Sequence, residues 1–150
     1  MTIVRHSSFI PVSAEVLFAF HMDPENLATI SPAFPPMRVE APDRPPVRGD
    51  LQTFVVGWNR CSIRWVARIE RVAPDRLLED VQEAGPFRRW RHQHLFATVP
   101  EGARLTDVVS FRLFPTLAGE FLEFWTVTPL LKAMFLYRHR RTRQIVLHHK

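Results

Sequence analysis

The sequence predicts an α+β fold in which a curved antiparallel sheet wraps around a long C-terminal helix, with two short helices after the first strand. Three observations support this prediction. The middle of the chain alternates apolar and polar residues between short turns. Two helix-capping patterns follow the first apolar segment, and the end of the chain changes to a helical period. A long amphipathic helix needs an apolar surface to cover, and only the sheet is large enough.

The first part of the chain combines strand and helix patterns. Val4 to Ile10 is expected to form a strand. Ser13 is a suitable N-cap for a first short helix, and Asp23 for a second that has Pro24 at its first position. A further short strand is expected from Met37 to Glu40, after these helices in the sequence.

The middle of the chain reads as strand after strand, and Asn59-Arg60 is expected to form a hairpin turn. Sequential strands joined by short turns favour an antiparallel meander. The expected strands are Leu51 to Trp58, Cys61 to Val72, Arg76 to Ala84, Phe87 to Val99 and Ala103 to Leu113.

The C-terminal part is predicted to hold two separate helices. Ala118 to Trp125 is expected to form the shorter one. From Pro129 onward apolar residues recur at helical spacing, so Pro129 is expected at the first position of the long helix with Thr128 as its cap.

Composition limits the class of protein. The 150 residues fit one domain spanning 1–150, and a hydrophobic content of 46% is typical of a globular chain. The net charge of +5 comes without a recognisable nucleic-acid-reading motif, so we expect no nucleic-acid partner, although the arginine-rich patches can touch an anionic membrane surface. We expect a monomer or a dimer.

Location can also be inferred from the sequence. Cys61 is the only cysteine, which is consistent with a reducing compartment, and the N-terminus has no secretory pattern. The most apolar region, Phe121 to Tyr137, is interrupted by polar residues and is a poor transmembrane segment. We therefore expect a cytoplasmic protein.

Several motifs resemble bacterial proteins of the SRPBCC (START-like) superfamily, in particular the cyclase/dehydrase or polyketide-cyclase-like group. They are Trp65-x-Ala67-x-Ile69, Asp80-x-Gln82-x-x-Gly85-Pro86-Phe87-x-x-Trp90-x-His92-x-His94-x-Phe96, Thr106-Asp107-x-Val109-x-Phe111 and Phe135-x-Tyr137-Arg138-His139-Arg140. The resemblance implies a helix-grip fold with a deep cavity between the sheet and the terminal helix. It also implies a small hydrophobic or amphipathic ligand such as a lipid, a quinone or a polyketide-like molecule.

Period-two geometry on the key strand places Trp90, His92, His94 and Phe96 on one face, which the aromatic residues mark as the concave one. Asp80 and Gln82 on the preceding strand, and Asp107 on the following one, are expected to join the two histidines as a polar group inside an aromatic interior. The expected ligand-binding residues are Trp65, Asp80, Gln82, Trp90, His92, His94, Phe96, Asp107, Val109, Phe111, Met134 and Phe135. His21 is placed either near the cavity entrance or on the surface.

The polar group has four interpretations. It can be a structural hydrogen-bond network or an anchor for the polar end of a ligand. As acid–base catalysts, His92 or His94 would act with Asp80 or Asp107. A zinc site would need both histidines and one of these aspartates, and two histidines alone are a weak indication. The glycines form no phosphate-binding pattern, and we expect neither a metal nor a cofactor.

Three functions therefore remain open. The first is non-catalytic binding of an apolar ligand, and the second is a cyclase or dehydratase. The third is a protein-interaction module with a filled core and an exposed apolar patch.

Overall fold

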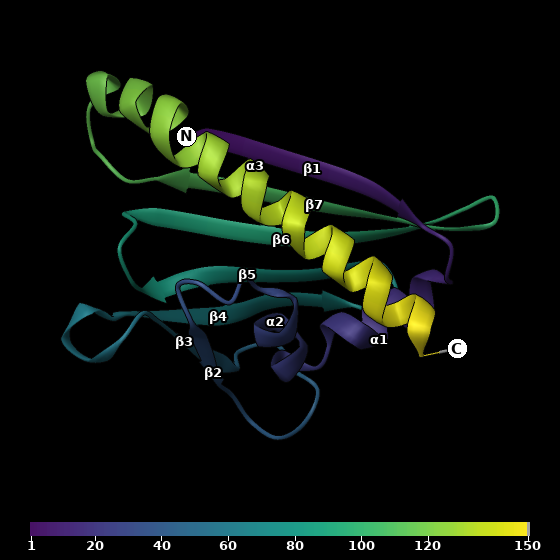
Figure 1. Cartoon of the computed structure of the whole chain (residues 1–150). Coiled ribbons are helices and arrows are strands. Elements are labelled where there is room, and N and C mark those ends of the chain that lie inside the picture. The colour runs from purple at the N-terminus through teal and green to yellow at the C-terminus, as the bar shows by residue number, and fades with distance from the viewer. Residues whose placement is uncertain (150) are drawn as a thin grey trace.

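Seven strands form one sheet in the computed structural model, which describes residues 1–149 (Figure 1). Their spatial order is β1-β7-β6-β5-β4-β3-β2, and every neighbouring pair is antiparallel. The predicted strands are confirmed to within a few residues at their ends. The strands are β1 (Thr2–Ile10), β2 (Met37–Glu40), β3 (Leu51–Val56), β4 (Ile63–Ala73), β5 (Leu77–Ala84), β6 (Arg89–Val99) and β7 (Gly102–Arg112).

The two short helices after the first strand are also confirmed. In α1 (Ala14–His21) the Ser13 side chain accepts a hydrogen bond from the backbone nitrogen of Val16. In α2 (Pro24–Ile30) the Asp23 carboxylate accepts one from the backbone nitrogen of Glu25. Both caps satisfy backbone N–H groups that the first helical turn leaves free.

The connection between β3 and β4 differs from the expected hairpin turn. It contains a short 3₁₀ helix, η1 (Asn59–Cys61). Gly57 precedes it with a φ of 106°, and a Cβ there would lie 2.5 Å from the carbonyl oxygen of Cys61. Only glycine fits this position, so the longer connection depends on Gly57.

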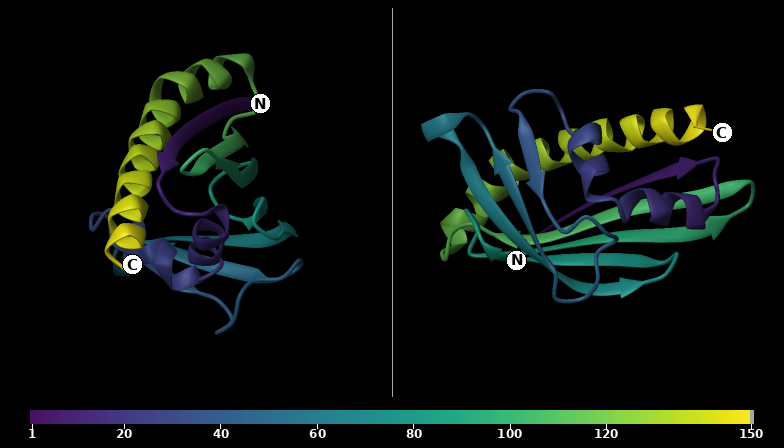
Figure 2. Two further views of the ribbon diagram at one scale, coloured as in Figure 1. Left: turned by 90° about the vertical axis from the view of Figure 1, so that its right-hand side faces the viewer. Right: turned by 90° about the horizontal axis from the view of Figure 1, so that it is seen from below.

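The prediction of two C-terminal helices is wrong. A single helix, α3 (Leu117–His148), covers both segments, and Thr116 rather than Thr128 caps it. Pro129 lies inside the helix, where it removes one backbone hydrogen bond and favours a bend. Figure 2 shows α3 curving along its length. The helix continues because its next turns bury Leu131 and Phe135 against the sheet.

The helix α3 crosses the concave face of the sheet and packs against β1, β7, α1 and α2 (Figure 2). This arrangement is the helix-grip fold. Two apolar clusters fill the interface. One surrounds α1 and includes Leu17, Phe18 and Phe96; the other, an aromatic cluster, includes Trp90, Phe111 and Phe135. None of the helices in residues 1–149 is both long and apolar enough to cross a membrane.

Candidate functional site

A belt of polar side chains crosses the concave face between the two apolar clusters. On β6, His92 and His94 lie between Trp90 of the aromatic cluster and Phe96 of the other. The belt continues onto the neighbouring strands, because Asp107 of β7 pairs with His94 of β6 on one side and with His6 of β1 on the other. The polar belt consists of His6, Ser8, Asp80, His92, His94, Asp107 and His139.

Asp107 is the centre of the polar belt. Its Oδ1 accepts a hydrogen bond from His92 Nε2 at 2.9 Å, and its Oδ2 accepts one from His139 Nε2 at 2.6 Å. The Nδ1 of His94 lies 2.6 Å from Oδ1 as an ion-pair contact, without the alignment of a hydrogen bond. Burial opposes ionisation of Asp107, but the facing His94 and the hydrogen bonds outweigh it and hold its pKa well below the usual range.

The sequence reasoning did not identify three members of the belt, His6, Ser8 and His139. His139 comes from α3, and its Nδ1 lies 2.7 Å from Ser8 Oγ. Because His139 Nε2 donates to a carboxylate, a neutral ring leaves Nδ1 to accept the hydroxyl proton of Ser8. The spacing of His139 four residues after Phe135 indicates that both side chains share one face of the helix.

Asp80 lies beside the same histidines, but its carboxylate has far fewer polar partners than that of Asp107. Its Oδ2 is 3.8 Å from His92 Nδ1, and its side chain is 16% exposed. Burial raises the pKa of Asp80 to about 6, and the facing His94 only partly offsets this effect. The structure therefore brings together four of the five predicted residues of the polar group, all except Gln82, and places the two aspartates in very different environments.

Two further basic side chains border the belt. The Nδ1 of His21 donates to the carbonyl of Leu17, and its ring centre lies 5.3 Å from that of His94, so His21 is an interior residue. Burial, followed by the charge of His94, lowers the pKa of His21 to about 3. Burial lowers the pKa of Arg138 to about 10, and its Nε has no hydrogen-bond partner within the described residues.

The space beside the belt is smaller than expected. His92, His94 and Asp107 line a cavity of about 10 Å³, together with residues of α2 and α3. That volume holds about one water molecule. The expected deep cavity is therefore not found at this position, because Phe135, Arg138 and His139 of α3 fill the space.

The remaining predicted ligand-binding residues lie on either side of the belt. Trp65, Trp90, Val109, Phe111, Met134 and Phe135 form the aromatic cluster with Phe87, whereas Phe96 packs on the other side near His21. Gln82 is used differently: its side-chain amide makes two hydrogen bonds to the backbone of Phe87 and holds the β5–β6 turn.

A larger opening lies at the C-terminal end of α3, where no site was predicted from the sequence. It is a solvent-open groove of about 760 Å³ between α1, the β6–β7 hairpin and the end of α3. Its apolar lining includes Val12, Val16, Phe20 and Ile145.

One protein-family model matches most of the chain. Residues 10–135 match the family described as polyketide cyclase/dehydrase and lipid transport. The chain belongs to this family. The matched residues include Asp80, His92, His94 and Asp107 of the polar belt and most of α3, whereas His6, Ser8 and His139 lie outside them. A comparison with curated proteins found no match.

Solved structures show the same fold. A Thermus thermophilus protein, TTHA0849, is 19% identical over 99% of each chain, with a TM-score of 0.78. A Rhodobacter sphaeroides protein is 16% identical over 99% of this chain and 94% of its own, with a TM-score of 0.76. DynU16, a putative protein in the dynemicin biosynthetic locus, is 18% identical over 99% of this chain and 48% of its own, with a TM-score of 0.66. At these identities the likeness shows the fold alone.

Proposed function

We propose that this member of the polyketide cyclase/dehydrase and lipid transport family binds a small apolar or amphipathic ligand between the sheet and α3. A lipid, a quinone or a polyketide-like molecule has the required chemistry. The site would be the aromatic cluster, with the polar belt facing the polar end of the ligand. We further propose that the protein works in the cytoplasm, as a monomer or a dimer.

The observation that carries the proposal is a set of buried polar atoms without partners at the aromatic cluster. Within the described residues, neither Trp65 Nε1 nor Thr128 Oγ1 has a hydrogen-bond partner. Trp65 belongs to the cluster, and Thr128 lies on α3 next to Val127, which packs against it. Burying such a group without a partner costs about 1–3 kcal/mol, so a ligand that supplies the partner gains affinity.

A route to this site is provided by the N-terminal half of α3. Phe121, Phe124 and Trp125 form an exposed aromatic segment, in which Phe121 is 69% exposed. Because the interior cavity at the belt is small, ligand binding requires α3 to move away from the sheet. Pro129 lies between the exposed segment and the buried turns, which is where a bend costs least.

The proposal is tested by native mass spectrometry of the freshly purified protein, followed by extraction and identification of any bound compound. Affinity for that compound, or for a panel of lipids and quinones, is then measured for two variants. Trp65→Phe removes the unpartnered N–H group, and Met134→Trp fills the aromatic cluster. We expect Met134→Trp to weaken binding at least tenfold and Trp65→Phe to weaken it several-fold.

Val16→Trp is the matched control, because it fills the groove beside α1 instead. Loss of binding in Val16→Trp alone would move the ligand to that groove and overturn the proposed site. A protein that carries no ligand, and that no member of the panel stabilises against heat, would overturn the binding function itself.

A second candidate, an interaction module, is favoured by one specific observation. The small interior cavity coexists with the exposed aromatic segment, and exposed apolar patches often mark binding surfaces. Its partner would be a protein or an anionic membrane surface. Replacing Phe121, Phe124 and Trp125 by serine should abolish flotation with anionic vesicles or capture of a partner. The same variant should retain the affinity for a preloaded soluble ligand.

The enzymatic alternative stays a prediction. Acid–base chemistry by His92 or His94 needs a substrate atom within hydrogen-bond reach, and the cavity beside them holds about one water molecule. Turnover of the extracted ligand by the wild type but not by a His92→Phe variant would support it.

A further inference from the structure

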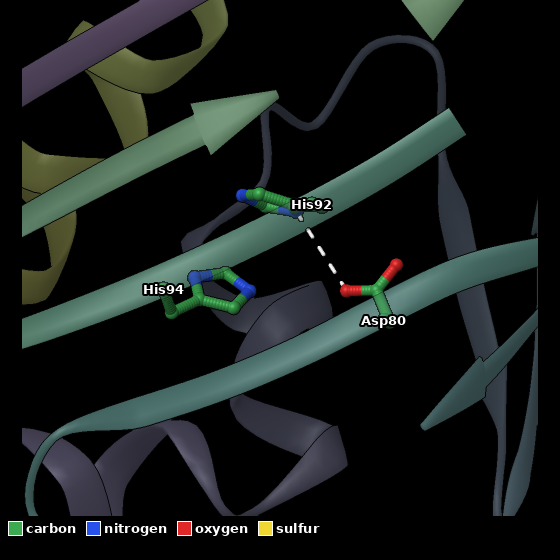
Figure 3. A group of neighbouring side chains, drawn as sticks. All are labelled: Asp80, His92 and His94. Carbon is green, nitrogen blue, oxygen red and sulfur yellow. Dashed lines mark ion pairs between the residues drawn. The ribbon is translucent and has the colours of Figure 1, made fainter. Parts of the chain in front are cut away.

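Three side chains of the polar belt point their donor atoms at one another. Figure 3 shows Asp80 on β5 facing His92 and His94 on β6. One potential ligand atom from each residue lies within 4.8 Å of the others, and Asp80 Oδ2 is 3.8 Å from His92 Nδ1. A separation of 3.8 Å is too long for a hydrogen bond, so Asp80 and His92 do not satisfy each other.

Asp107 determines which nitrogens carry protons. His92 presents Nε2 to Asp107, and His94 presents Nδ1 to it. An ionised carboxylate can only accept, so His92 Nε2 holds a proton and its neutral ring leaves a lone pair on Nδ1. His94 Nδ1 lies 2.6 Å from the same carboxylate without the alignment of a hydrogen bond, and a lone pair there would repel the carboxylate. We therefore assign the proton of His94 to Nδ1, which leaves the lone pair of its neutral ring on Nε2. Those free nitrogens are His92 Nδ1 and His94 Nε2, and in Figure 3 both lie on the side of Asp80.

This arrangement has the features of a histidine metal site. A histidine that binds a metal normally donates its other ring N–H to a carboxylate, which fixes the ring and its tautomer. Here the buried carboxylate of Asp107 accepts such a hydrogen bond from His92 and lies 2.6 Å from His94 Nδ1, a close contact that is not aligned as a hydrogen bond. Asp80 supplies a third, anionic donor, and within the described residues its carboxylate accepts no hydrogen bond that would compete.

We propose that Asp80, His92 and His94 bind a divalent transition-metal ion, with Asp107 as the residue that orients both histidines. Two imidazoles and one carboxylate suit zinc or iron(II). Zinc lies about 2.0–2.2 Å from such donors, which places tetrahedral donors about 3.3 Å apart. Asp80 Oδ2 lies 3.8 Å from His92 Nδ1, which is close to that spacing, and no hydrogen bond from residues 1–149 fixes the Asp80 side chain.

The charges around the site are compatible with a cation. Asp80 and Asp107 together carry two negative charges when ionised, against the one permanent positive charge of Arg138. Three protein ligands leave a fourth tetrahedral position free for water or a polar ligand group. His92 and His94 also line the small cavity that Arg138 borders, so an anionic group at that position would face a cation.

This inference is independent of the proposed function, because metal binding can be measured without an organic ligand. It also resolves an alternative that the sequence left open, since either aspartate was a possible third ligand. The geometry assigns Asp80 to the metal and Asp107 to the histidines.

The test is a titration of chelator-stripped protein with Zn²⁺ in competition with a chromophoric chelator, together with the visible absorption spectrum of the Co²⁺-loaded protein. We expect one zinc ion per chain and a Co²⁺ spectrum with the intense bands of a tetrahedral site. Asp80→Asn and His94→Gln should each weaken Zn²⁺ binding by about 10–100-fold or more. Far-UV circular dichroism checks that both variants are folded.

The control is His148→Gln with His149→Gln, which removes the two adjacent exposed histidines at the end of α3. This double variant should bind zinc like the wild type. Zinc binding that survives Asp80→Asn and His94→Gln but is lost in the double variant would overturn the proposal. An absence of stoichiometric zinc and cobalt binding in the folded wild type would overturn it as well.

Discussion

Asp80 and Asp107 are both acids of the concave face, on the strands that flank β6, and both face the same two histidines. Ring nitrogens of His92, His94 and His139 lie within 2.9 Å of the Asp107 carboxylate, whereas the one ion-pair contact of Asp80 within residues 1–149 is with His92, at 3.8 Å. The pKa of Asp107 is lowered and that of Asp80 is raised to about 6. One carboxylate therefore holds the interior together, and the other remains free to bind something else.

The largest effect is expected from Asp107→Asn. The amide keeps only one acceptor oxygen for the hydrogen bonds from His92 and His139, and it removes the negative charge that lies 2.6 Å from His94. Breaking a buried charged network costs about 3–5 kcal/mol, so the free energy of unfolding should fall by about that amount. Urea denaturation followed by tryptophan fluorescence measures it. A loss below about 1 kcal/mol would mean that Asp107 does not organise the belt.

His139→Gln should have the next largest effect. It leaves Asp107 Oδ2 and the Ser8 hydroxyl without their shared partner. Unsatisfied buried groups cost about 1–3 kcal/mol, which the same denaturation measurement resolves. Ser8→Ala, which leaves the hydrogen bond between His139 and Asp107 in place, should cost less. The opposite order would show that the hydroxyl, rather than the carboxylate, determines the position of His139.

A third buried acid, Glu123, lies outside the polar belt. It is fully buried on α3 and accepts hydrogen bonds from the backbone nitrogens of Leu113 and Phe114 and from Thr2 Oγ1. Burial opposes ionisation, but these hydrogen bonds hold the pKa of Glu123 below its ordinary value of 4.5. A lowered carboxylate pKa stabilises the fold above about pH 4.5, and that stability is lost as the pH falls through the folded-state pKa.

Glu123→Gln should therefore lower stability at neutral pH by about 1–3 kcal/mol and flatten its decline between neutral and acidic pH. Thermal unfolding recorded from about pH 7 down to about pH 3 tests both effects. A variant whose stability falls with pH as steeply as that of the wild type would place the acid sensitivity elsewhere.

The smallest effect is expected from Asp80→Asn. The substitution removes a buried charge that accepts no hydrogen bond from the described residues, so the free energy of unfolding of metal-free protein should change by less than about 1 kcal/mol, or increase. Denaturation of chelator-treated samples measures it. A loss as large as that of Asp107→Asn would show that both carboxylates are structural.

Much of this arrangement could be predicted from local patterns. Period-two alternation on β6 places Trp90, His92, His94 and Phe96 on the concave face, and short turns align Asp80 and Asp107 with them. Asp80, His92, His94 and Asp107 meet as predicted, whereas Gln82, which was expected to join them, bonds to the backbone of Phe87. Ser13 and Asp23 cap the two short helices because capping depends only on neighbouring residues.

What could not be predicted depends on long-range packing. His139 reaches Asp107 only because α3 crosses the sheet at a particular position, which no local pattern encodes. Pro129 was expected to begin a helix, but the burial of Leu131 and Phe135 outweighs the one hydrogen bond it removes. The cavity volume depends on how α3 fills the interior, so the resemblance to a ligand-binding group did not predict it.

The proline inside α3 also has a mechanical consequence. With no N–H at residue 129, the carbonyl of Trp125 lacks its helical donor, and the helix can flex there without breaking another backbone bond. The stiffness of α3 is therefore lowest between two anchored halves: Glu123 holds the first half to Thr2 of β1, and His139 holds the second to Asp107 of β7. Because each half has its own anchor, a bend at this point lets α3 follow the curved sheet while both contacts are kept.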